Sequence, residues 1–329
     1  MRIAVVLAGA VAKGAFEAGV LHTLVRSNMQ IVRIVGSSSG ALNGTMLAAA
    51  VRSRDLEAGT QRLVELWRDH AEWNDVFHAR FSLIHSLSGV SDQARLTALL
   101  KAQIPAAPAL DEIDLRLLVA PLFGVTGSIG DHPATTYESV QEFTSADFTT
   151  DAGLARVFTA ATASSAFPFV FAPVTIDPIG PCVDGGAVNN TPMKLALEGS
   201  AVDAIVVVTT TVELRQEPPT DLHGIQLASH LGGMLIGERL YRDLRETDDV
   251  NLSLTRLQQL VDDETLTPDQ LDRVLAALGW TDRKPVRVIQ IRPLAELPGS
   301  SFAGFFDPKL RATYIDEGAR RAADVLALT

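Results

Sequence analysis

The chain is poor in cysteine, in aromatic residues and in basic charge. One of its 329 residues is cysteine, Cys182, so no disulfide can form within the chain. A single cysteine fits a reducing compartment, and we expect a cytoplasmic protein. The 28 Lys and Arg residues are outnumbered by 39 Asp and Glu, which gives a formal net charge of −11. Nucleic acids require a basic protein surface, so we expect no nucleic-acid partner.

Long hydrophobic runs are also missing. No stretch after the N-terminus reaches the roughly 18 apolar residues that a transmembrane helix needs. The net negative charge predicts no attraction to anionic lipid, so any membrane contact should be peripheral, apolar and local. Residues 1–12 resemble a short signal peptide, but we expect a buried strand over residues 2–8, because the residues that follow continue a structural pattern. The seven histidines are scattered without zinc-site spacing, and we expect neither a metal nor a cofactor.

The remaining composition, 47% hydrophobic and 20% charged, is typical of an ordered globular protein. The first fifty residues predict a strand, a helix over 14–24, a second strand, a tight turn and a second helix. This order predicts a parallel sheet with helices on both faces. Further strands are expected over 117–125 (broken near Pro121), 135–137, 204–210 and 286–291. Further helices are expected over 56–67, 94–104, 153–166, 226–244 and 307–328, with another opened by Asn190, Thr191 and Pro192. We predict one domain over 1–329, with helical additions at about 52–112 and 222–283.

The run Gly36-Ser37-Ser38-Ser39-Gly40 has the form Gly-x-Ser-x-Gly. A β-branched run precedes it and a helix-forming run follows it, as a nucleophile elbow requires. Such a turn exposes the hydroxyl of Ser38, and the N-terminus of the following helix favours a developing anion. The same pattern of small residues also occurs as plain packing between a strand and a helix.

A serine hydroxyl needs a base before it becomes a good nucleophile. One possible arrangement is a Ser-His-Asp triad of Ser38, Asp184 and either His223 or His230. His230 lies in a helical run and His223 follows a proline-containing loop (213–221), whereas the triad histidine of an α/β-hydrolase follows a strand. The other arrangement pairs the serine with an aspartate alone. The context of the histidines favours the second arrangement.

Three separated segments carry a resemblance to a known family: the glycine-containing loop and helix at 7–21, the Gly-x-Ser-x-Gly run at 36–40, and the segment 163–174 followed by Val183-Asp184-Gly185-Gly186. In this order and spacing, within residues 5–192, they resemble the patatin-like phospholipase family. The resemblance implies a three-layer α/β/α fold with a mainly parallel central sheet. It also implies a cofactor-free lipid acyl hydrolase of the phospholipase A or esterase type, acting on a lipid or acyl ester. In it, Ser38 is the nucleophile and Asp184 the base.

The resemblance further implies an oxyanion hole made by backbone N–H groups, with candidates at Gly9, Ala10, Val11 and Ser39. The motif glycines are Gly14, Gly36, Gly40, Gly185 and Gly186. The family pattern Gly-Gly-Gly-x-Lys/Arg-Gly is here Gly9-Ala10-Val11-Ala12-Lys13-Gly14. A valine at position 11 is strained if its φ is positive. Lys13 could steady this loop, attract an anionic head group, or be an ordinary exposed lysine.

Other interpretations of the same residues remain. The loop 9–14 is neither a Walker A motif nor Gly-x-Gly-x-x-Gly, so nucleotide binding is a weak alternative. A protein on the same scaffold that binds a lipid or acyl chain without turnover is a stronger one. For an enzyme, the apolar stretch 167–174 would form a dry wall that raises the pKa of Asp184. The helix expected at 226–244 is either a lid or a helix packed on the core.

Overall fold

The computed structural model describes residues 1–327 except 77, 80–90, 130, 169, 199–201, 213–224 and 282. For residues 78–79, 129 and 225–237 it describes the backbone but not the side chains. The expected loop at 213–221, with His223 beyond it, therefore lies outside the described residues. Among the helices described, none is both long and apolar enough to cross a membrane.

A mostly parallel sheet forms the centre of the molecule, in the order β12-β11-β1-β2-β5-β10-β9, with β8 also paired to β5. The parallel strands are β1 (Arg2–Leu7), β2 (Gln30–Ser37), β5 (Asp114–Pro121), β11 (Ala204–Val208) and β12 (Arg287–Ile291). The antiparallel strands are β8 (Ser139–Thr144), β9 (Val174–Ile176) and β10 (Gly180–Asp184). Two small sheets pair β3 (His78–Ala79) with β4 (Ser91–Asp92), and β6 (Val125–Ile129) with β7 (His132–Thr136).

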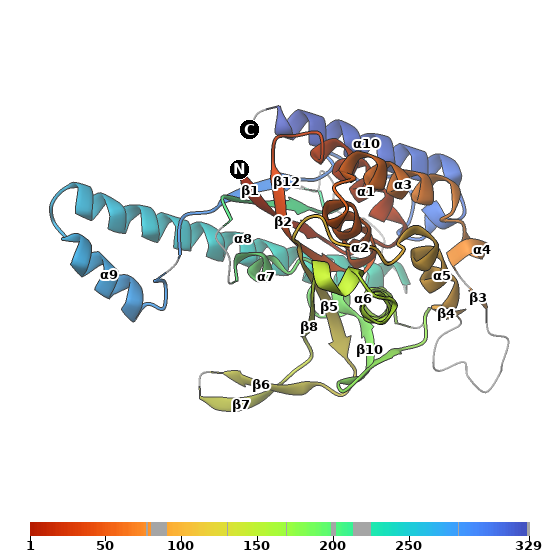
Figure 1. Ribbon diagram of the computed structural model, residues 1–329, viewed down its shortest axis with the longest axis horizontal. Coiled ribbons are helices and arrows are strands. Elements are labelled where there is room, and N and C mark those ends of the chain that lie inside the picture. Colours follow the sequence, from red (N-terminus) through yellow and green to blue (C-terminus); the bar gives the residue numbers. More distant parts are fainter. Residues whose placement is uncertain are drawn as a thin grey trace.

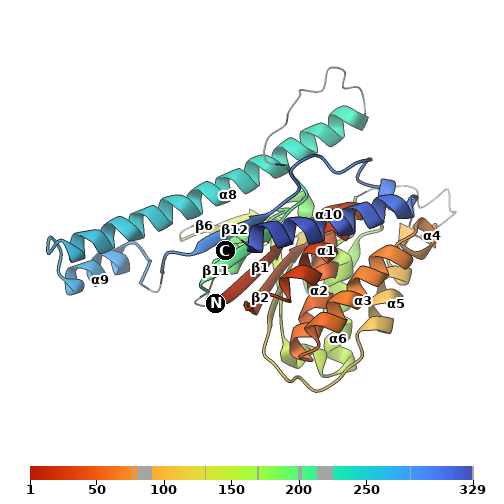
Figure 2. The same cartoon turned by 90° about the horizontal axis from the view of Figure 1, so that it is seen from above.

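Helices cover both faces of the sheet (Figures 1 and 2). On one face lie α1 (Gly14–Leu24), α2 (Ser39–Arg52), α3 (Leu56–Asp69), α4 (Trp73–Val76), α5 (Ala94–Gln103), α6 (Asp151–Ser164) and α10 (Pro308–Leu326). On the other lie α7 (Met193–Leu197) and α8 (Ile225–Asp262), and α9 (Pro268–Ala277) folds back beside the end of α8. Short 3-10 turns occur at η1 (Val11–Lys13), η2 (Ser145–Phe148), η3 (Gly185–Ala187) and η4 (Ala303–Phe305).

The first strand shows why the sheet needs two helical layers. Successive side chains of a strand point to opposite faces. Ile3, Val5 and Leu7 enter the larger core with α1 and α2, whereas Ala4 and Val6 enter a second core with Leu240 of α8. Because β1 is buried on both faces from Ile3 onward, that part of its sequence is continuously apolar. The expected strand over residues 2–8 and the expected α/β/α fold are confirmed.

Several expected elements differ in extent. The strand expected over 117–125 is two strands, because β5 ends at Pro121 and β6 begins at Val125. The helix expected over 226–244 continues to Asp262. Asn190 does not cap a helix: α7 begins at Met193 with Pro192 as its N-cap, and no side chain caps it. Three antiparallel strands, β8, β9 and β10, were not expected because they are short and lack a continuous apolar pattern.

Candidate active site

Ser38 is the single residue between the end of a strand and the start of a helix. β2 ends at Ser37 and α2 begins at Ser39, and Ser38 has φ 56° and ψ −128°. This left-handed turn is strained for a residue other than glycine, as in a nucleophile elbow. The turn also brings two backbones together, because a Cβ on Gly40 would lie 2.3 Å from the carbonyl oxygen of Leu7. The Ser38 N–H donates to Ser164 Oγ at 3.0 Å, which anchors the turn to the end of α6.

Asp184 reaches the serine from the opposite side of one strand. β5 lies between β2 and β10, with Leu118 paired to Ser37 and the neighbouring Val119 paired to Asp184. Ser38 Oγ donates a hydrogen bond of 2.6 Å to Asp184 Oδ2. The close approach requires glycine next to the aspartate, because a Cβ on Gly185 would lie 2.2 Å from the carbonyl oxygen of Leu118. The sheet thus brings together two residues that are 146 positions apart.

The environment of Asp184 favours its neutral form. The residue is 3% exposed, and burial raises the pKa of its carboxyl to about 7. Hydrogen bonds from the Ser38 hydroxyl and the Gly186 N–H oppose this rise. A carboxylate with a pKa near neutrality is a far better base than an ordinary aspartate. The arrangement is therefore suited to accept a proton from Ser38 at neutral pH.

The loop expected to form the oxyanion hole lies beside Ser38, but its N–H groups differ in availability. The Gly9 N–H donates to the carbonyl oxygen of Asn190 at 3.2 Å. The Ala10 N–H donates to Ser39 Oγ at 2.9 Å. Among the described residues, the N–H groups of Val11 and Ser39 have no hydrogen-bond acceptor. Because the N–H groups of Gly9 and Ala10 are both engaged within the fold, those of Val11 and Ser39 are the better candidates for binding a developing oxyanion.

The other expected site residues also lie around the elbow. Gly14 begins α1 against Ser39, Gly36 lies in β2 against the Gly40 carbonyl, and Gly186 lies in η3 beside Asp184. The Lys13 ammonium donates to the Leu297 carbonyl at 3.0 Å, so this side chain steadies the loop.

Val11 has φ 53°, a left-handed conformation that a β-branched side chain rarely adopts. We expect Val11→Gly to raise the free energy of unfolding by about 1 kcal/mol, because the strain relieved exceeds the backbone entropy that glycine adds. Val25 is the matched control, since it is partly buried against the same core with φ −66°. Urea titration measures both variants, and Val25→Gly should lower the free energy of unfolding. Equal losses in the two variants would contradict a strained Val11.

Asn190 clamps the loop that carries Gly9. Its carbonyl oxygen accepts from the Gly9 N–H at 3.2 Å, and its Nδ2 donates to the Gly9 carbonyl oxygen at 2.9 Å. Its Oδ1 lies close to both Gly9 and Gly186. A Cβ on Gly9 would lie 2.2 Å from this oxygen, and a Cβ on Gly186 would lie 2.5 Å from it. One residue therefore joins the loop before Val11 to the loop after Asp184. The sequence around Asn190 predicts a helix start and gives no sign of this role.

We expect Asn190→Ala to lower kcat for ester hydrolysis by roughly 10- to 100-fold with little change in KM, because misplaced donors weaken transition-state binding most. The lost buried hydrogen bond should also cost about 1–2 kcal/mol of stability. Asn189→Ala is the control, because Asn189 is buried and its Oδ1 has no hydrogen-bond partner among the described residues. Steady-state kinetics in which the two variants behave alike would contradict the clamp.

A cavity of about 110 Å³ opens beside Ser38 and Asp184. Its wall is almost wholly apolar and comes from α2, α3, α5 and the segment around η4. Apolar members include Leu42, Met46, Leu63, Leu66, Leu99, Leu100, Phe171 and Phe302. The apolar wall expected from residues 167–174 is therefore present in part, through Phe167 and Phe171. Helices of the expected addition at 52–112 supply much of the remainder, which the sequence did not indicate.

In the described part of the chain, few side chains are placed to take part in histidine or metal chemistry at this site. His70 is the described histidine in the cavity wall, and no hydrogen bond joins it to Ser38. His223 and the side chain of His230, the histidines of the alternative triad, lie outside the described residues. Among the described residues, no group of three or more His, Cys, Asp or Glu could hold a metal ion.

Similarity to a known protein family is found over the segment that carries Ser38 and Asp184. No curated protein matches the chain. Among solved structures, VipD from Legionella pneumophila matches with a TM-score of 0.43 at 12% identity. That match covers 99% of this chain but 66% of VipD, so the chain spans just under two thirds of that protein. The family model described as patatin-like phospholipase matches residues 5–197, more than half of the chain. The chain therefore belongs to the patatin-like phospholipase family.

Proposed function

We propose that the protein is a serine lipid acyl hydrolase in which Ser38 and Asp184 form a catalytic dyad. Membership of the family supports lipid hydrolase activity in general. The observation that carries the finer proposal is the 2.6 Å hydrogen bond from Ser38 Oγ to Asp184 Oδ2 beside an apolar cavity. Such a cavity suits an acyl chain, and we propose carboxylic esters of fatty acids as substrates.

The proposed reaction has two halves. Ser38 Oγ attacks the ester carbonyl carbon while its proton passes to Asp184 Oδ2, and the N–H groups of Val11 and Ser39 stabilise the resulting oxyanion. Collapse of this intermediate breaks the bond to the alcohol, which leaves with the proton from Asp184, and an acyl ester on Ser38 remains. Water then attacks that ester and gives a proton to Asp184. Collapse of this second intermediate breaks the bond to Ser38 Oγ, which takes the proton back from Asp184, and releases the fatty acid and the free serine.

The hydrolysis of a medium-chain p-nitrophenyl ester tests the proposal against its alternatives. We expect the unaltered protein and His230→Ala to be active, and Ser38→Ala and Asp184→Asn to be inactive. A folded but inactive His230→Ala protein would favour the triad. An unaltered protein that binds the ester without hydrolysing it would favour a binding protein on the same fold.

A further inference from the structure

We propose that a band of aromatic side chains at the mouth of the cavity docks the protein on a zwitterionic lipid surface. This inference rests on the proposed function, because the lipid surface would hold the ester that Ser38 attacks. The members of this aromatic band are Trp73, Phe167, Phe302, Phe305 and Phe306. They come from α4, from the segment after α6, and from the segment around η4.

The aromatic band consists of two groups of rings in contact. In the first, Phe167 meets Phe302 edge to face, with ring centroids 5.6 Å apart and an interplanar angle of 82°, and Phe302 lies 6.2 Å from Phe305. In the second, Phe306 stacks on Trp73 with ring centroids 4.9 Å apart. Phe305 and Phe306 are adjacent in the chain and join the two groups, a marked concentration for a chain in which aromatic residues make up 6%.

The aromatic band joins the cavity to the protein surface. Phe167, Phe302 and Phe305 belong to the cavity wall. At the other end, Phe306 is 65% exposed, and Phe167 is itself 38% exposed. Large exposed apolar side chains that continue into an apolar cavity indicate a binding surface rather than scattered surface residues. Because Phe167, Phe302 and Phe305 line the same cavity as Ser38, an acyl chain that enters past them would reach the serine.

A buried arginine fixes the two halves of the aromatic band to each other. Arg311 is 1% exposed, and its Nη1 donates to the carbonyl oxygen of Gly304 in η4 at 2.8 Å. Its Nε and Nη2 donate to the carbonyl oxygen of Arg68 near the end of α3, at 3.3 Å and 3.1 Å. Because these contacts hold η4 against the segment that leads to Trp73, docking would need little ordering of the protein.

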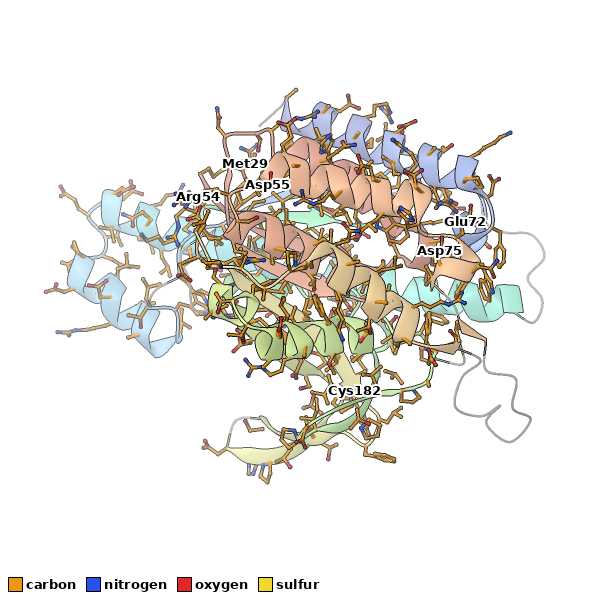
Figure 3. The ribbon with its side chains drawn as sticks, turned by 45° about the vertical axis from the view of Figure 1, so that its right-hand side comes forward. Met29, Arg54, Asp55, Glu72, Asp75 and Cys182 are labelled. Atoms are coloured by element: carbon orange, nitrogen blue, oxygen red, sulfur yellow. The ribbon has the colours of Figure 1, made fainter. Side chains whose placement is uncertain are left out.

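The charges beside the aromatic band select the kind of lipid. Glu72 and Asp75, labelled in Figure 3, flank Trp73 in the chain, and Asp307 follows Phe306. The whole chain also carries a formal net charge of −11. Basic side chains lie here too, since Arg95 Nη1 donates to the carbonyl oxygen of Asn74 and Lys309 follows Asp307 by two residues. The surroundings of the band therefore carry both signs of charge and give no excess of basic charge to attract anionic lipid, whereas aromatic side chains insert readily at the interface of a neutral bilayer. The occupant that fits is therefore a zwitterionic surface, such as phosphatidylcholine.

The experiment is cosedimentation of the full chain with phosphatidylcholine vesicles, with Phe306→Ser compared to Leu278→Ser. Leu278 is 50% exposed at the end of α9, which lies at the opposite end of the molecule from α4 (Figures 1 and 2). We expect Phe306→Ser to weaken vesicle binding about tenfold and Leu278→Ser to leave it unchanged. Replacing part of the phosphatidylcholine by phosphatidylglycerol should weaken binding. Vesicles should shift the tryptophan emission to shorter wavelength, less so in Trp73→Phe.

Equal binding by the two variants, no binding by the unaltered protein, or binding that requires phosphatidylglycerol would each overturn the inference. A dimer in sedimentation velocity that is lost in Phe306→Ser would assign the aromatic band to a second copy instead. Phe306 is outside the cavity wall, so Phe306→Ser should hydrolyse a soluble short-chain p-nitrophenyl ester at the unaltered rate. If no variant hydrolyses that ester while vesicle binding still depends on Phe306, the proposed function fails and the docking surface stands.

Discussion

Replacing Ser38 by alanine is expected to lower ester turnover by about 10⁴- to 10⁶-fold while the fold is retained. The change removes the atom that would form the acyl ester, so no other group in the proposed dyad can replace it. The hydroxyl donates to Asp184, whereas the anchoring bond to Ser164 comes from the Ser38 backbone and survives the substitution. Rates with a p-nitrophenyl ester, together with circular dichroism, measure both parts of the expectation.

Ser37→Ala is the control for that experiment. Ser37 is the preceding serine, it is fully buried, and within the part of the chain that the structure describes its Oγ has no hydrogen-bond partner. Its replacement should leave turnover within a few-fold of the unaltered rate. A Ser38→Ala protein that keeps a tenth or more of the activity would contradict the role of Ser38. If Ser37→Ala loses as much turnover as Ser38→Ala, the loss in both variants would come from disruption of the elbow and not from the missing Ser38 hydroxyl.

Replacing Asp184 by asparagine is expected to lower kcat by about 10⁴-fold, because the amide cannot accept the proton from Ser38. The same change should stabilise the fold at alkaline pH. Asparagine can still accept from the Gly186 N–H and can donate to Ser38 Oγ, so both hydrogen bonds of the carboxylate have replacements. The amide also carries no charge that burial would penalise.

The stability gain of Asp184→Asn should depend on pH. The pKa of this carboxyl rises from 3.8 to about 7 on folding. Between those values the folded protein binds a proton that the unfolded chain has lost, so folding stability falls as the pH rises from about 4 to about 7. The full loss is on the order of 4 kcal/mol. Urea unfolding should therefore show Asp184→Asn close to the unaltered protein at pH 4 and more stable at pH 8. A gain that does not change with pH would contradict a raised pKa.

The sequence predicted those parts of the site that depend on local backbone geometry. The Gly-x-Ser-x-Gly run predicts a strand, a tight turn and a helix, and Ser38 lies in that turn. Asp184 was expected from the family resemblance carried by segment 163–174 and Val183-Asp184-Gly185-Gly186, and the structure brings it to Ser38. Val11 was expected to be strained if its φ were positive, and its φ is 53°. In each case neighbouring residues carry the signal.

The sequence did not predict the parts that depend on distant contacts. Asn190 precedes Thr191 and Pro192, a pattern that favours a helix start, yet its side chain bonds to Gly9, 181 positions away. The Gly9 N–H, expected to face an oxyanion, instead donates to Asn190. The helices α3 and α5 were expected from their periodicity, but nothing local indicated that Leu63 and Leu100 would line a cavity beside Ser38. Such contacts are fixed by packing, which propensity does not encode.

The measurement that tests the dyad most directly is the labelling of the protein by a fluorophosphonate, followed by mass spectrometry and repeated across pH. We expect one adduct, on Ser38, formed at a rate that rises about tenfold per pH unit below 7 and levels off above it, because the ionised form of Asp184 is the base. In Asp184→Asn the labelling should be nearly lost. An adduct on another residue, or undiminished labelling of Asp184→Asn, would contradict the dyad.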